Sequence, residues 1–164
     1  MLNNNFKNWL VEQLYQTQVT QKFKKIDGTE TNTTLYAFSS LFKANTAKIN
    51  NITASGFTFA LGSGTTPATK EDYFVETQID NDEHFSIAAA SIVNNANQGK
   101  VICQQVWNYS NSENPTQEVT INEIGFCVCN GSGSQRYMMA REVLESPITV
   151  KDGDTFSVAI TIGG

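Results

Sequence analysis

The chain has 164 residues, of which 16% are charged, and its formal net charge is −5 at pH 7. This length suffices for one domain with its own hydrophobic core, and the charged fraction lies below the usual value of about 25%. The acidic balance excludes the basic surface expected of a nucleic-acid-binding protein, because the single basic cluster around Phe23 is too small to reverse it.

The N-terminal segment has the pattern of an amphipathic helix. From about Asn4 to Thr17, apolar residues recur every three or four positions, and Asn3 to Asn5 offer side chains for an N-cap. The apolar stripe can lie across the protein's own sheet or anchor the chain on a neighbouring subunit, and its residues are Phe6, Trp9, Leu10 and Leu14. As an anchor it would be separable, so a chain lacking residues 1–17 is expected to fold.

Residues 1–27 are accordingly expected to form a helix and a connecting arm, and residues 28–164 a single domain. The first residues lack the basic flank, apolar segment and cleavage site of a secretory signal, and no apolar run reaches membrane-spanning length. We therefore expect a soluble protein that is made in the cytoplasm and has no membrane partner.

Beyond Gly28, short apolar runs with a period of two, separated by Gly, Asn and Pro, indicate an all-β domain. We expect an antiparallel β-sandwich, jelly-roll or immunoglobulin-like, after the short helix. A tight turn at Lys151–Asp154 predicts a hairpin-like reversal from Pro147–Val150 into the last strand. The expected strands are Leu35–Phe42, Gly56–Leu61, Phe85–Ala90, Lys100–Tyr109, Glu118–Cys129, Tyr137–Leu144 and Thr155–Ile162.

The segment from Leu61 to Tyr73 is rich in small residues and has the composition of a structural joint. Its glycines allow unusual backbone angles, its proline restricts the preceding residue, and its hydroxyl groups can bond to the backbone. It lacks both GxxxxGK[ST] and GxGxxG, so we expect no phosphate site here. The joint residues are Gly62, Gly64, Pro67, Asp72 and Tyr73.

No residue pattern points to catalysis or to a cofactor. The only histidine, His84, lies in a hydrophilic turn, where Asp80, Asp82 and Glu83 offer oxygen ligands to Ca²⁺ without forming an EF-hand loop. Core packing is favoured over a redox or metal role for the cysteines, which are expected to be free thiols: Cys103, Cys127 and Cys129. We expect no enzyme, no cofactor and no metal.

One carboxylate falls on an apolar strand face. Alternation places Val119, Ile121 and Glu123 on the same side of their strand, and a buried Glu must find a partner. Arg141, in the following strand, can provide a bidentate one. We expect a structural Glu123–Arg141 ion pair, with a change of register at Gly125 as the competing explanation.

Three ordered segments together resemble a pattern found in small structural proteins of tailed bacteriophages and prophages. They are Leu61–Glu76 (LGSGTTPATKEDYFVE), Asn122–Phe126 (NEIGF) and Ala140–Ile162 (AREVLESPITVKDGDTFSVAITI). The resemblance implies a virion β-sandwich that packs on or between other virion proteins, capsid or tail subunits, as part of a homo-oligomer. It covers about Gly56–Ile162 and leaves the N-terminal helix outside.

We therefore expect a virion protein, in the first place a head decoration or cement subunit. Similar sequences occur in head-associated and tail-associated proteins, so a tail, neck or fibre-attachment component is the alternative within this class. A carbohydrate-binding β-sandwich is the alternative from another class, because Trp107 and Tyr109 share a strand face and could form a stacking platform. Alternating aromatic residues also suit a core or an interface.

Overall fold

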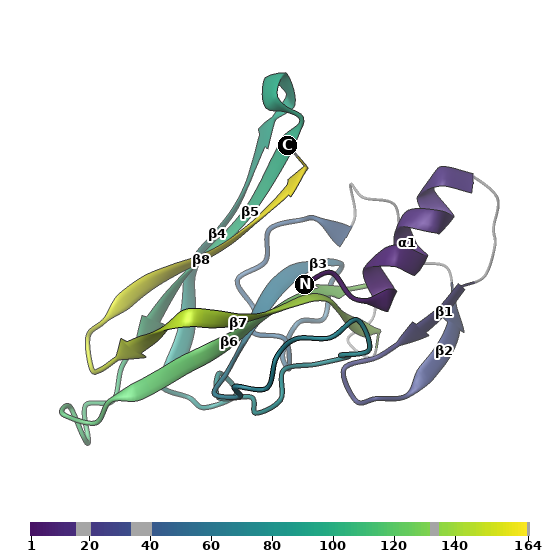
Figure 1. The fold of residues 1–164 in the computed structure, drawn as a ribbon. Helices are drawn as coiled ribbons and strands as arrows, with labels where there is room; N and C mark the ends of the chain where they lie inside the picture. The colour runs from purple at the N-terminus through teal and green to yellow at the C-terminus, as the bar shows by residue number, and fades with distance from the viewer. Residues whose placement is uncertain (16–20, 34–40, 132–134, 164) are drawn as a thin grey trace.

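The computed structural model describes residues 1–15, 21–33, 41–131 and 135–163, and the side chain of Leu14 lies outside the described part. One helix precedes three antiparallel sheets (Figure 1). The elements are α1 (Asn4–Tyr15), β1 (Gln21–Lys24), β2 (Glu30–Thr33), β3 (Gly56–Gly62), β4 (Phe85–Asn95), a 3-10 turn (Ala96–Gln98), β5 (Lys100–Tyr109), β6 (Val119–Cys129), β7 (Arg136–Val150) and β8 (Thr155–Gly163).

The expected all-β architecture behind a short helix is confirmed. Two three-stranded sheets, ordered β3-β6-β7 and β4-β5-β8, enclose one apolar cluster, while β1 and β2 form a separate hairpin. The centre of the cluster is aromatic: the ring of Phe59 lies 5.5 Å from that of Phe126, and Trp107 stacks on Phe156. Both sheets therefore bury their inner faces against each other, as a sandwich requires.

Most expected strands appear near their predicted positions, and three differ. The strand expected at Phe85–Ala90 continues to Asn95 as β4. The run Tyr137–Leu144 continues to Val150 as one long strand, β7, which bulges against β6 between Val143 and Ile148. Such a bulge accommodates Pro147, which cannot donate a ladder hydrogen bond. The strand expected at Leu35–Phe42 lies mostly outside the described residues, and its last two residues are not in a strand.

The turn before β8 is present, but the two strands that it joins do not pair with each other. Strand β7 belongs to one sheet and β8 to the other, so they diverge from the turn (Figure 1). The turn is held by β5 instead: Tyr109 N–H donates to the carbonyl of Asp154 at 2.9 Å, and Gly153 N–H donates to the carbonyl of Tyr109 at 3.1 Å. These bonds place β8 beside β5 and leave a gap beside β7.

Helix α1 packs on the protein's own core. Phe6 and Trp9 are 7% and 3% exposed and belong to the same cluster as Phe126. The ring of Trp9 lies 5.6 Å from that of Phe42. Leu10, in contrast, is 42% exposed. Phe6 and Trp9 are therefore core residues of this chain and not free to anchor it on a partner.

The N-terminal residues are also bonded into β7. Asn3 caps the helix, accepting from the N–H of Phe6 at 3.2 Å, and its amide donates to the carbonyl of Met138 at 2.6 Å. The amide of Asn5 donates to the same carbonyl at 3.0 Å. Removing residues 1–17 would leave this carbonyl and part of the core uncovered, so the structure argues against a truncated chain of native stability. The first 27 residues share the core of the rest.

Candidate functional site

The expected Glu123–Arg141 contact is present at the centre of a buried network. Arg141 Nε donates to Glu123 Oε2 at 2.7 Å, and the two side chains are 4% and 0% exposed. Glu123 also accepts three backbone N–H groups, from Gly64 and Thr77 on Oε1 and from Glu76 on Oε2, each at 3.0 Å. Four donors thus offset the free-energy cost of burying this carboxylate away from water.

The joint residues supply the rest of this network. Arg141 Nη1 donates to Asp72 Oδ2 at 2.8 Å, and Asp72 also accepts the N–H and hydroxyl of Thr69. Burial by itself would raise the pKa of Asp72, but the hydrogen bonds from Thr69 and Arg141 outweigh it and hold the pKa below its usual value. Arg141 Nη2 lies 3.7 Å from Glu76 Oε2. One arginine therefore joins three carboxylates.

Two glycines allow the loop to approach these carboxylates. A Cβ on Gly64 would lie 2.5 Å from Glu76 Oε2 and 2.6 Å from Glu123 Oε1, and one on Gly62 would lie 2.6 Å from Glu123 Cγ. Neither glycine has a positive φ, so the requirement is space and not backbone conformation. Pro67 and Tyr73 are exposed and lie outside the network. The other joint residues, Gly62, Gly64 and Asp72, therefore belong to the same network as the Glu123–Arg141 ion pair.

Register also changes near Glu123, although not at Gly125. The pairing of β6 with β7 shifts between Ile121 and Glu123, and again between Phe126 and Cys127. The ion pair is therefore the explanation that the structure bears out, and the register change expected at Gly125 is wrong, because Gly125 pairs with Arg141 in register.

The edge of β3 is closed by a different set of groups, which the sequence analysis missed. Phe57 N–H donates to the carbonyl of Lys43 at 2.9 Å, Phe59 N–H to Gln105 Oε1 at 3.0 Å, and Leu61 N–H to Asp80 Oδ1 at 3.2 Å. Gln105 lies on the inner face of β5, between Cys103 and Trp107. The sequence did carry a signal for this contact, because Gln105 is a polar residue at an apolar position of an alternating strand.

The alternative sites of the sequence analysis are not assembled. Trp107 and Tyr109 are 0% and 2% exposed, so they are core residues and the proposed sugar-stacking platform is wrong. Asp80 is buried, and burial raises its pKa to about 6. Within the described residues, no three His, Cys, Asp or Glu side chains are arranged to hold a metal ion. The three cysteines are buried in the core, as the core-packing prediction expected.

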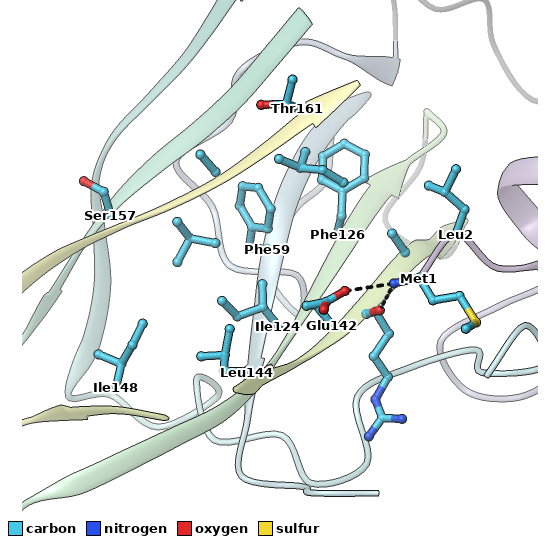
Figure 2. Close-up of a pocket in the computed structure, with 15 residues that line it drawn as sticks. Met1, Leu2, Phe59, Ile124, Phe126, Glu142, Leu144, Ile148, Ser157 and Thr161 are labelled. Carbon is cyan, nitrogen blue, oxygen red and sulfur yellow. Dashed lines mark hydrogen bonds and ion pairs between the residues drawn. The ribbon is translucent and has the colours of Figure 1, made fainter. Parts of the chain in front are cut away.

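A groove of about 560 Å³ lies where β7 and β8 diverge. Its floor is apolar, and Figure 2 shows Phe59, Phe126, Ile124, Leu144 and Ile148 gathered in it, with Glu142 at the end where Met1 lies. One wall is β8, whose Ser157 and Thr161 side chains point away from the groove. Met1 and Leu2 lie at one end of it.

The sheet that borders this groove is almost free of charge. Lys100 is the only charged residue in the described strands β4, β5 and β8. The outer face of the sheet carries small, hydroxyl and aliphatic side chains, and the exposed ones are Ser86, Ala89, Ser91, Val93, Thr155, Ser157, Ala159 and Thr161. Charged residues normally cover such a face in a protein that works alone. This face and its edges have the composition of a contact surface, which is depleted in charge.

Comparisons with known proteins gave no match to a family model, to a curated protein or to a solved structure. None of the described helices has the length and apolar character that crossing a membrane requires.

Proposed function

We propose that this chain is a structural subunit of a tailed-phage particle, most specifically a head decoration or cement subunit. It works by binding neighbouring subunits and catalyses no reaction. The observation that carries the proposal is the sheet β4-β5-β8, because an exposed sheet with one charged residue suits a permanent contact better than a solvated surface.

The buried network at Arg141 supports the resemblance to phage structural proteins, because all three of the resembling segments contribute residues to it. They contribute Gly64, Asp72 and Glu76 from the first, Glu123 from the second and Arg141 from the third. The ordered motifs thus encode one buried joint that fixes a loop to two strands. A rigid joint of this kind suits a subunit that presents static surfaces, since little conformational entropy is lost on assembly.

The test is the composition of particles. Lysates of the phage or lysogen that encodes the chain are fractionated on a density gradient, and peptides of the chain are quantified by mass spectrometry. We expect many copies per particle, in the fraction of separated heads. Recovery with separated tails would favour the tail, neck or fibre-attachment role, and recovery only in the soluble fraction would contradict the proposal.

A further inference from the structure

We infer that β8 is the seam through which two copies of this chain pair, edge to edge and antiparallel, into a continuous six-stranded sheet. The inference rests on the proposed function and deepens it, because it names the first partner of the subunit as a second copy of itself. The edges of the two sheets differ in how well they are covered, and an uncovered edge exposes backbone donors and acceptors that can bind another strand.

Two of the other edges carry protection within the described residues. The edge of β3 is closed at Phe57, Phe59 and Leu61 by the groups described above. The edge of β7 is closed in part by the N-terminus: Asn3 N–H donates to the carbonyl of Met139 at 3.1 Å, and Arg141 N–H to the carbonyl of Met1 at 3.0 Å. Met1 and its neighbours therefore already act as a short added strand.

The edge of β4 is interrupted by a bulge at Ala88, where its register against β5 shifts. Bulges of this kind discourage further pairing. The edge of β8 has neither device. Strand β8 pairs with β5 without a shift from Thr155 to Gly163, and β5 is its only partner strand among the described residues. It contains no charged residue and no proline. It is the edge best suited to accept a strand.

The sequence of β8 is complementary to itself. A two-fold axis at Ala159 sets Val158 opposite Ile160, Phe156 opposite Ile162 and Ser157 opposite Thr161 of the second copy, so apolar residues meet apolar ones and hydroxyls meet hydroxyls. Because the strand has no charge, this pairing brings no like charges together. A partner of different sequence would gain no such match by symmetry.

The groove explains why the neighbouring strand does not obstruct this pairing. Divergence of β7 from β8 leaves space beside the β8 edge, and the apolar side chains Leu144 and Ile148 face that space (Figure 2). In the pair, the two grooves meet beneath the seam. The half-buried apolar walls of both copies would then cover each other, which accounts for a groove that is otherwise exposed to water.

A cysteine placed on the axis tests this geometry. Paired residues of antiparallel strands have Cα atoms about 4.5 to 5.5 Å apart, within the range that a disulfide spans. Ala159→Cys should therefore form a disulfide-linked dimer in high yield when a mild oxidant such as diamide is added. Ser157→Cys is the matched control, because the two introduced thiols would lie on strand positions about 13 Å apart, too far to bridge. The native cysteines are buried and should not react.

Charge at the seam gives an independent test. Light scattering after size-exclusion chromatography should show a dimer for the native chain and a monomer for Ala159→Glu, since the axis brings the two carboxylates together. Ala89→Glu, on the exposed face of β4 in the same sheet, should leave the dimer intact. Circular dichroism spectra should be the same for all three proteins, which shows that each is folded.

A native monomer at high concentration, equal cross-linking of both cysteine variants, or dissociation by Ala89→Glu alone would overturn the seam. The proposed function is judged separately, by the presence of the chain in particles. A chain that is abundant in particles yet never cross-links at residue 159 would refute the seam and leave the function standing. A chain that dimerises through residue 159 but is absent from particles would support the seam and refute the proposed function.

Discussion

Replacing Glu123 by Gln should destabilise the protein more than any other single isosteric change in the network. The carboxylate accepts four hydrogen bonds, two on each oxygen, from Arg141 and from three backbone N–H groups. A glutamine amide has one acceptor oxygen, so its NH2 group would face two donors, whichever way it is turned.

The size of the effect follows from these contacts. Two hydrogen bonds to a charged acceptor are lost, each contributing about 1.5–3 kcal/mol, and removing one partner of a buried ion pair costs about 3–5 kcal/mol. These figures describe the same contacts and do not add, so we expect a loss of about 3–5 kcal/mol. A domain of this kind has a total stability of about 5–15 kcal/mol. Glu142→Gln, whose side chain is 70% exposed, is the matched control and should change stability by less than about 0.5 kcal/mol.

Urea unfolding at pH 7, followed by tryptophan fluorescence, measures both variants and Arg141→Met. Removal of Arg141 leaves Glu123 with its three backbone donors but also takes the cation from Asp72 and Glu76, so Arg141→Met should cost at least as much stability as Glu123→Gln. A loss below about 1 kcal/mol for Glu123→Gln would refute the view that the carboxylate organises the joint.

Three further changes test other parts of the structure. Gly64→Ala should cost about 1–3 kcal/mol in chemical denaturation because its methyl group would collide with the carboxylates of Glu76 and Glu123; an unchanged midpoint would contradict this. Burial raises the pKa of Asp80 to about 6, above its unfolded value, so the contribution of this residue to stability is fully present below about pH 4 and falls by about 3 kcal/mol as pH rises through 6; Asp80→Asn should remove this contribution from the slope of stability against pH, and a native-like slope in the variant would be evidence against it. Trp9→Ala should lower stability by about 3–5 kcal/mol and Leu10→Ala by less than about 1 kcal/mol in thermal unfolding, whereas equal effects would contradict the internal packing of the helix.

The parts of the fold that were predictable are those governed by local pattern. Period-two alternation located β3, β5, β6 and β8 to within one residue at either end. The same alternation identified Glu123 as a misplaced carboxylate, and Arg141 in the next strand was its nearest available cation. The N-cap at Asn3 followed from the known preference for asparagine before a helix.

The remaining features depend on contacts between distant residues. Trp107 and Tyr109 have the same spacing in a core as on a binding face, so only the position of the second sheet decided between them. The divergence of β7 from β8 arises from bonds between their turn and Tyr109, far away in the sequence. Gly62 and Gly64 suggested turn geometry, whereas their role is to make room for carboxylates. The hairpin of β1 and β2 showed no alternation that distinguished it from a connecting arm.

Cryo-electron microscopy of intact particles tests the central claim most directly. We expect the two three-stranded sheets and the α1 helix to fit density that recurs with the symmetry of the particle, with the β4-β5-β8 sheet buried against neighbouring subunits. A reconstruction in which every ordered component is accounted for by other proteins, with this fold found nowhere, would contradict the account.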